Sequence, residues 1–282
     1  MIQSRGRRRK VASKIWWGLC WLAAALVMFG LFDLLWSIVL KGAESFRFSM
    51  LTTVTHGIAG GLQNAIIGTF ELIVVAIIIA APIGILGGVY ASEFSGRRTA
   101  QILRFLAEVL SGVPSIVIGY FGYLLMVLQF GWGFSAIAGG ISLTIIMLPY
   151  ILRNTESSLR LVPLTQREAA WALGMTKFQA IAKTTWRPAA GGIATGVLLA
   201  IAIGLGETAP LLYTAGWNPN NPTFAMTHSQ VGYLTYVVWT YLDQPYPQAR
   251  ALAYSAAFVL LVIILFIQLV VRGMVWRASR SR

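Results

Sequence analysis

The chain has 282 residues, of which 57% are hydrophobic and only 11% charged, and its mean hydropathy is +0.72. Soluble domains carry about a quarter charged residues, so this composition excludes a soluble protein and indicates an integral membrane protein. A net charge of +13 would indicate a nucleic-acid partner in a soluble protein, but here the placement of the basic residues offers another explanation.

Six apolar stretches are each long enough to cross a bilayer, which takes about 20 residues. They cover residues 15–40, 65–91, 105–129, 134–152, 189–213 and 251–271. The first is too long for the apolar region of a secretory signal and ends without a cleavage-like sequence, so we expect it to be retained. The pattern predicts an all-α fold class, a polytopic membrane protein with six transmembrane helices.

The basic residues are distributed unevenly between the two sides of these spans. Nineteen of the 22 Lys and Arg residues fall in the two tails, around the start of the third span and in the loop after the fourth span. Only Lys41, Arg47 and Arg250 fall on the other side. Because loops rich in Lys and Arg stay in the cytoplasm, both termini are predicted to be cytoplasmic. Topology and contact with anionic lipid then account for the basic excess, and no nucleic-acid partner is expected.

This topology predicts three parts of the chain: a basic cytoplasmic tail at residues 1–14, a six-helix transmembrane domain at 15–271 and a cytoplasmic tail at 272–282. Within the transmembrane domain, the cytoplasmic loop 163–188 and the external loop 215–250 are the longest polar intervals between spans.

Acidic residues inside the spans are functional candidates, because an ionisable side chain within the bilayer is costly. Asp33, Glu71 and Glu108 lie in the first three spans. For these three, a structural role, such as an interhelical hydrogen bond or a pair with arginine, is favoured over a functional one, and both stay open.

Two spans contain predicted breaks. Residues 111–115 read Ser-Gly-Val-Pro-Ser in the third span, and residues 204–210 read Gly-Leu-Gly-Glu-Thr-Ala-Pro in the fifth. Backbone groups freed at such breaks can line a cavity in the membrane. Glu207, which lies in the second break, is therefore expected to have a pathway or gating role.

The loop 163–188 has the pattern of two short helices joined at a glycine. Thr165 and Glu168 fit a capping box, Gly174 fits a left-handed turn that ends the first helix, and Thr176 with Gln179 fits a second capping box. The Arg187-Pro188 pair is expected to end the second helix, because a residue before proline disfavours the helical conformation. Two short helices between two spans are suited to docking on a partner.

The residues of this loop resemble the EAA loop of the permease subunits of ABC importers. The match consists of Glu168, Ala169 and Ala170, followed by Gly174. The resemblance implies coupling helices that sit in a groove of a cytoplasmic ATPase. An amphipathic cytoplasmic loop with ordinary caps is the alternative.

The external loop 215–250 is rich in Asn, Pro, Thr and aromatic residues. Trp217, Trp239, Tyr241 and Tyr246 are typical of an interfacial belt, and residues 233–242 are expected to form a short helix lying on the membrane. An external partner could bind this loop. Packing of the loop on its own bundle is an equally open interpretation.

Three further motifs strengthen the resemblance. Residues 113–117 (VPSIV), 148–156 (LPYILRNTE) and 206–212 (GETAPLL) resemble the A-type (PstA) permease family of phosphate ABC importers, with matching order and spacing from about residue 64 to residue 215. The resemblance implies a type I ABC importer permease bundle in the bacterial inner membrane. It also implies a PstC-type sister permease, a PstB-type ATPase dimer and an external PstS-type phosphate-binding protein as partners.

The resemblance also implies roles for particular residues. Substrate pathway or gating roles fall on Arg153, Glu156, Glu207, Thr208 and Ser111, and ATPase coupling falls on Glu168, Ala169, Ala170 and Gly174. ATP and Mg would belong to the partner ATPase, so no cofactor is expected in this chain. The family usually has an arginine three residues before the glycine of the GET motif, and here that residue is Ile203. An anion pathway needs positive potential, so the substrate stays open between phosphate and another oxyanion.

Two other function classes fit the sequence less well. A secondary transporter could use Asp33 or Glu207 as a proton site. A membrane enzyme is not expected, because His56, His228 and Cys20 form neither a metal-ligand spacing nor a nucleophile–base grouping. No lysine is both preceded by glycine and followed by Ser or Thr, so the P-loop motif is absent and energy must come from another chain. The sequence therefore favours a transport subunit without an enzymatic site or a metal.

Overall fold

The computed structural model describes residues 2–280, and most of them are helical. The helices are α1 (Ile2–Ser45), α2 (Gln63–Val89), α3 (Arg97–Gly112), α4 (Ser115–Gly122), α5 (Ala136–Arg160), α6 (Leu164–Ala172), α7 (Lys177–Ala180), α8 (Trp186–Gly206), α9 (Ala209–Thr214), α10 (Leu234–Leu242) and α11 (Pro247–Arg280). A 3₁₀ turn, η1 (Phe48–Leu51), and three π-helical turns, η2 (Tyr90–Phe94), η3 (Tyr123–Gln129) and η4 (Ile181–Thr185), extend or connect them. The small antiparallel pair of β1 (Thr55–His56) and β2 (Ala59–Gly60) joins α1 to α2.

The six predicted spans correspond to helices in the structure. Five helices are long and apolar enough to cross a membrane, and the count is six if α3 and the segment Ser115–Gln129, which meet at an angle of 92°, are taken together as one bent span. The bend lies at Val113 and Pro114, where a break was predicted. The predicted break in the fifth span is also confirmed, because α8 ends at Gly206 and α9 begins at Ala209. The expected all-α, polytopic fold class is therefore confirmed.

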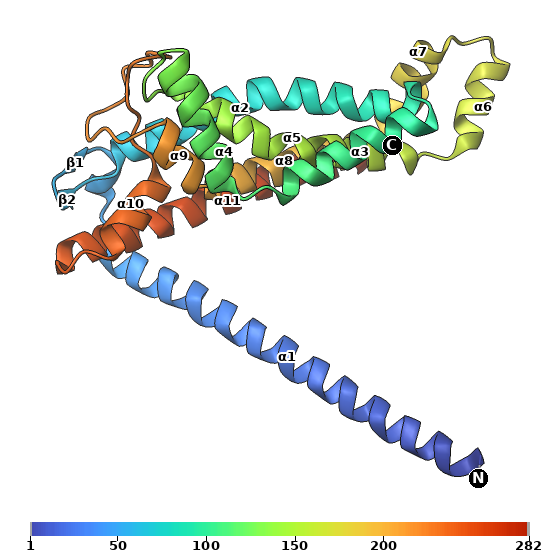
Figure 1. The fold of residues 1–282 in the computed structure, drawn as a ribbon, viewed down its shortest axis with the longest axis horizontal. Helices are drawn as coiled ribbons and strands as arrows, with labels where there is room; N and C mark the ends of the chain where they lie inside the picture. Colours follow the sequence, from blue (N-terminus) through green and yellow to red (C-terminus); the bar gives the residue numbers. More distant parts are fainter. Residues whose placement is uncertain (1, 281–282) are drawn as a thin grey trace.

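Helix α5 lies at the centre of the bundle, packed against α2 and α8 (Figure 1). Glycines allow this close approach: a Cβ atom at Gly88 of α2 would lie 2.6 Å from the Cβ of Thr155 and 2.7 Å from the Leu152 carbonyl oxygen. Small residues at helix contacts are the usual means of tight packing in membranes. The core around this contact is apolar and includes Leu72, Leu143, Met147, Ile151 and Leu205.

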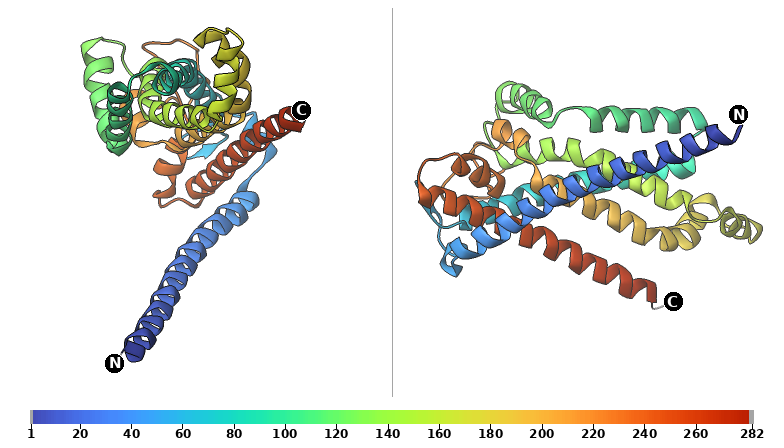
Figure 2. Two further views of the ribbon diagram at one scale, coloured as in Figure 1. Left: turned by 90° about the vertical axis from the view of Figure 1, so that its right-hand side faces the viewer. Right: turned by 90° about the horizontal axis from the view of Figure 1, so that it is seen from below.

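Helix α1 leaves the bundle at a wide angle (Figure 1), and the left-hand view of Figure 2 shows the same separation from another side. It contacts α11 near its C-terminal end, where Gly42 packs on Phe258. The rest of its apolar span is exposed in the isolated chain. This surface, which carries Asp33, is available to lipid or to another membrane chain.

The loop between α9 and α11 packs on its own bundle. The Tyr241 hydroxyl donates a hydrogen bond of 2.7 Å to the Gly57 carbonyl, and burial raises the pKa of this tyrosine. The Trp217 ring stacks on Tyr236 at 4.4 Å between centroids. Of the four aromatic residues expected in an interfacial belt, Trp239 and Tyr246 are exposed. The predicted short helix is confirmed as α10, and most of its contacts are with α11.

Candidate functional site

The bundle has two distinct ends. Helices α6 and α7 project from one end, which we call the α6/α7 end, and α10 with the β pair lies at the other, the α10 end (Figure 1). The candidate residues divide between the α6/α7 projection, a charged cluster between α3 and α5, and the break after α8.

The two predicted helices of the projection form, with two corrections to their ends. Gly174 has φ +75° and Thr176 forms a capping box with Gln179, as predicted. The capping box at Thr165 was wrong, because α6 begins earlier, after Pro163, and has no side-chain cap. The stop at Pro188 was also wrong, because the chain stays helical from Lys177 to Gly206. Pro188 lies just after the π turn η4, an irregular turn that lets the helix continue through the proline.

The coupling residues expected from the sequence are not equally accessible. Glu168, Ala169 and Gly174 are exposed, whereas Ala170 is only 2% exposed and packs into the chain's own fold. Leu173 and Phe178 are 78% and 73% exposed, and sequence reasoning missed them. The sequence did contain an indication of their role, since each is a large apolar residue in a polar loop. Exposed apolar groups of this kind mark interaction surfaces.

Arg167 fastens α6 to the bundle. Its guanidinium forms a 2.8 Å ion pair with Glu93 in η2 and donates a 2.7 Å hydrogen bond to the Leu159 carbonyl of α5. The side chains are only 15% and 6% exposed. One arginine therefore joins the projection to the ends of two spans. The sequence reasoning assigned no role to this residue.

A charged cluster joins α3 to α5 (the α3/α5 cluster: Arg104, Glu108, Arg153, Glu156 and Arg160). Glu156 accepts bonds from Arg104 at 2.7 Å and from Arg160 at 2.9 Å. In the second pair the charges are exchanged between the helices: Arg153 of α5 pairs with Glu108 of α3 at 2.8 Å. Because α3 and α5 run antiparallel, these pairs form a ladder along one face of the two helices. Glu108 therefore pairs with an arginine, as the structural role favoured for it from the sequence requires.

A cavity of about 480 Å³ opens beside this cluster. It is lined by Arg104 of α3 and by residues at or just after the α6/α7 end of α5, namely Arg153, Asn154, Glu156, Ser157, Arg160 and Leu161. Of the charged lining residues, Glu156 is buried, while the three arginine side chains are partly exposed. The cavity has the polar, cationic lining that an anion requires.

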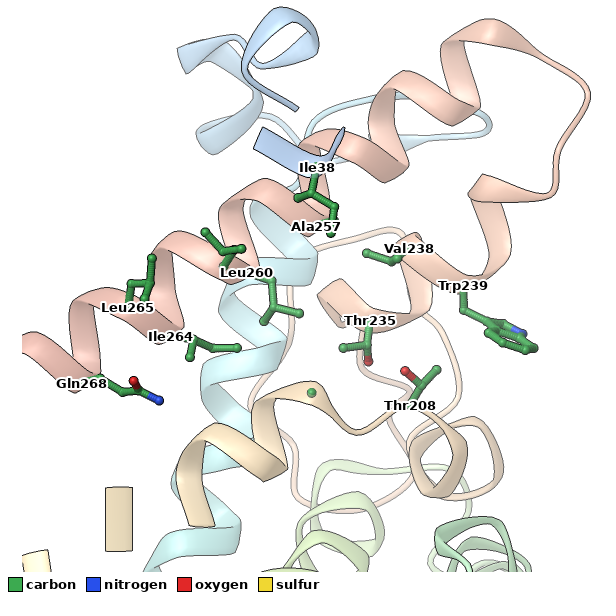
Figure 3. Close-up of a pocket in the computed structure, with 12 residues that line it drawn as sticks. Ile38, Thr208, Thr235, Val238, Trp239, Ala257, Leu260, Ile264, Leu265 and Gln268 are labelled. Atoms are coloured by element: carbon green, nitrogen blue, oxygen red, sulfur yellow. The ribbon is translucent and has the colours of Figure 1, made fainter. Parts of the chain in front are cut away.

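Glu207 and Thr208 lie elsewhere, at the break between α8 and α9. The Glu207 carbonyl accepts a 2.8 Å hydrogen bond from Thr235, and its carboxylate interacts with the Ser115 hydroxyl at the start of α4. Gly119 of α4 packs against Pro210 of α9 without room for a side chain. The two predicted breaks therefore lie against each other in space. Thr208 also lines a second, mainly apolar cavity of about 510 Å³ between α10 and α11 (Figure 3).

The structure does not bring all the expected pathway residues together. Helices α5 and α8 are antiparallel, with Gly196 facing Asn154 and Gly204 facing Met147. By this register, Glu207 lies level with a point on α5 about nine residues before Arg153. At the helical rise per residue, this separates the two residues by about 13 Å along the helix axis. Ser111 lies between them on α3, and its hydroxyl donates to the carbonyls of Ala107 and Glu108.

Two other acidic candidates lack a salt bridge. In the described part of the chain, Asp33 forms no ion pair on the exposed face of α1, and Glu71 is buried in α2 with one carboxylate oxygen unpaired. Within residues 2–280, no group of three or more His, Cys, Asp and Glu side chains could hold a metal ion.

The chain matches the family model of the binding-protein-dependent transport system inner membrane component over residues 80–279. It is 44% identical to the phosphate transport system permease protein PstA 2 of Mycobacterium bovis over 273 residues, which cover 97% of this chain and 91% of that protein. It is 37% identical to the phosphate transport system permease protein PstA of Haemophilus influenzae, with 94% of each chain covered.

Solved structures share the fold at lower identity. A chain of the MetNI methionine ABC transporter in an inward-facing conformation is 17% identical, with a TM-score of 0.59 over 83% of this chain and 99% of that one. A chain of a bacterial ABC transporter for the polysaccharide alginate is 15% identical, with a TM-score of 0.61 over 95% and 99%.

Proposed function

The chain belongs to the family of binding-protein-dependent transport system inner membrane components, and we propose that it is the permease subunit that carries inorganic phosphate inward in a phosphate ABC importer. ATP hydrolysis on a separate ATPase subunit drives the transport. The chain is a transport subunit and not an enzyme, and ATP with Mg belongs to the ATPase.

The observation that carries this proposal is the polar strip along α3 and α5. The strip begins with the α3/α5 cluster and continues through Ser111 to the Ser115–Glu207 contact. Most of the cluster lies at the predicted membrane boundary, but Glu108 and Glu207 lie within predicted spans. Charged groups within a membrane face a bundle interior or a water-filled cavity, because contact with lipid is costly. A second membrane chain must therefore cover the strip. We assign that position to a PstC-type sister permease, with the substrate pathway between the two subunits.

Arg153, Glu156, Ser111, Glu207 and Thr208 line or gate this pathway in our proposal. The first two belong to its α6/α7 side, and the others belong to the region of the two helix breaks. Discontinuous helices near the midplane are common at transporter substrate sites, where freed backbone groups contact the substrate.

The residue Ile203 removes one positive charge that the A-type permeases usually provide. The α3/α5 cluster supports an anion pathway without it, because three arginines face two carboxylates there. Specificity for another oxyanion is the alternative that Ile203 favours. A self-sufficient secondary transporter is a weaker alternative, since it gives no role to the α6/α7 projection.

We propose that both termini and the α6/α7 end face the cytoplasm of a bacterial inner membrane, as the distribution of Lys and Arg supports. Residues 1–14 and 272–282 are then cytoplasmic tails on the transmembrane domain 15–271, in which 163–188 is the coupling loop and 215–250 the external loop. Residues 1, 281 and 282 of these tails lie outside the described residues.

In this orientation the coupling loop docks on a PstB-type ATPase dimer. Glu168, Ala169 and Gly174 contact the ATPase directly, together with the exposed Leu173 and Phe178, while Ala170 packs beneath them. A PstS-type phosphate-binding protein delivers the substrate at the α10 end, next to the external loop.

Uptake by proteoliposomes tests the proposal. The four proteins are reconstituted, ATP is enclosed on the ATPase side, and radiolabelled phosphate is supplied with the binding protein on the other side. ATP-dependent accumulation of phosphate, with excess unlabelled sulfate having no effect, is expected. Accumulation without the ATPase would instead favour the secondary transporter, and competition by sulfate would favour a different oxyanion.

A further inference from the structure

The cavity beside the α3/α5 cluster contains more positive charge than its own carboxylates neutralise. The ion pairs place three guanidinium groups against two carboxylates, Glu156 and Glu108, which leaves one net positive charge. The Glu156 side chain is 5% exposed, whereas those of Arg104, Arg153 and Arg160 are 30%, 42% and 49% exposed. The carboxylate is therefore covered, and the arginines are open to a solute.

The arginines also retain hydrogen-bonding capacity. Among the described residues, Arg153 and Arg160 each use only their Nη2 atom in an ion pair, and Arg104 uses Nη2 and Nε. Their remaining N–H groups can donate to another acceptor. The planar guanidinium fork matches pairs of phosphate oxygens in geometry and charge.

The size of the cavity fits a hydrated anion. Its volume of about 480 Å³ is many times the share of one water in the liquid, which is about 30 Å³. An anion can therefore enter with part of its water shell. Asn154 and Ser157 add neutral polar groups to the lining.

We propose that this cavity binds phosphate oxygens through Arg104, Arg153 and Arg160, and that orthophosphate occupies it as the last site before release at the α6/α7 end. This inference rests on the function proposed above and adds Arg104 and Arg160 to the residues that contact the substrate. The nearby Glu156 keeps binding weak, because its charge repels an anion. Weak binding suits an exit site, since conduction requires a substrate that can leave.

Equilibrium binding of radiolabelled orthophosphate tests this site. The complex of both permeases and the ATPase is placed in phosphatidylcholine nanodiscs, without nucleotide and without the binding protein. Arg160→Gln removes one guanidinium and leaves the Arg104–Glu156 pair, and Ser157→Asp adds a negative charge to the lining. Each variant is expected to weaken binding about tenfold, as loss of a charge-assisted hydrogen bond or added repulsion does.

Arg98→Gln is the matched control. Arg98 is an exposed arginine of the same helix as Arg104 and does not line the cavity, so the control loses the same charge without touching the site. It is expected to bind orthophosphate like the wild type. The inference is wrong if all three variants bind alike. If phosphate uptake is normal in that case, the proposed function still stands. A complex that never takes up phosphate delivered by the binding protein would contradict the proposed function itself.

A lipid headgroup has the same phosphate chemistry, so a second arm replaces part of the phosphatidylcholine with phosphatidylglycerol. For an exit site, the affinity for orthophosphate is expected to change less than twofold. Loss of orthophosphate binding in these discs would assign the cavity to lipid headgroups and overturn its role in release.

Discussion

The guanidinium of Arg167 lies 2.8 Å from the carboxylate of Glu93, and this nearly buried pair joins α6 to η2, the turn that follows α2. The same arginine donates to the Leu159 carbonyl at the end of α5. In the proposed complex, a displacement of α6 by a docked ATPase would be passed to two spans through this one side chain.

Arg167→Gln is expected to uncouple hydrolysis from transport. The substitution leaves the Glu93 carboxylate buried without its partner, and breaking a buried pair destabilises the local contact by about 3–5 kcal/mol. In reconstituted complex, ATP hydrolysis should continue while phosphate taken up per ATP falls several-fold. Gln166→Ala, an exposed neighbour on α6, is the control. A wild-type ratio of uptake to hydrolysis in Arg167→Gln contradicts the role given to this pair.

Gly174 is expected to tolerate substitution in folding but not in coupling. Its φ of +75° is a left-handed conformation that costs an L-residue about 1–2 kcal/mol, and no atom lies within 4 Å of the position of a Cβ. Gly174→Asp should therefore insert into the membrane normally but reorient α6 against α7 and impair uptake. Gly96→Ala, at an open position with negative φ, should behave as wild type. Normal uptake by Gly174→Asp would remove the glycine from the docking surface.

Arg153 and Glu108 should respond in opposite directions, although they form one ion pair. Arg153→Gln removes a cation from the proposed pathway and leaves the 60%-exposed Glu108 carboxylate to repel the anion. Glu108→Gln removes that repulsion and frees the guanidinium. We expect phosphate uptake to fall at least tenfold in Arg153→Gln and to be retained in Glu108→Gln. Equal losses in both variants would indicate that the pair only fastens α3 to α5.

The contact of α2 with α5 should be sensitive to a single methyl group. A Cβ at Gly88 would overlap Thr155 and the Leu152 carbonyl, and overpacking of this kind costs about 1–3 kcal/mol. Gly88→Ala is expected to lower the melting temperature of the purified complex by several degrees. Gly30→Ala, at an open position on α1, should leave it unchanged. An unchanged melting temperature in Gly88→Ala would show that the two helices separate easily.

Features determined by neighbouring residues were predictable from the sequence. The turn at Gly174 and the capping box at Thr176 depend on a few consecutive residues, and both form. The breaks at Pro114 and after Gly206 were likewise readable from the local sequence. Thr165 and Pro188 failed as boundaries, because the helix that Thr165 was to cap begins earlier and a π turn absorbs the proline.

Features that depend on packing between distant segments were not predictable. Arg104 and Arg160 both meet Glu156, but Arg104 is 52 residues away from it in the chain. Arg167 is 74 residues from Glu93. A single sequence gives the charge of each residue but does not show which residues of another helix lie against it. The distance between the α3/α5 cluster and Glu207 was unpredictable for the same reason, since it depends on the register in which α8 packs against α5.

ATP hydrolysis by the complete complex in lipid tests the central claim most directly. The chain is reconstituted with its sister permease, the ATPase and the external binding protein, and phosphate is titrated against sulfate and molybdate. We predict saturable stimulation of hydrolysis by phosphate alone, despite Ile203. Stimulation by sulfate or molybdate in place of phosphate, or a chain that never associates with an ATPase, would contradict the claim that this is a phosphate importer permease.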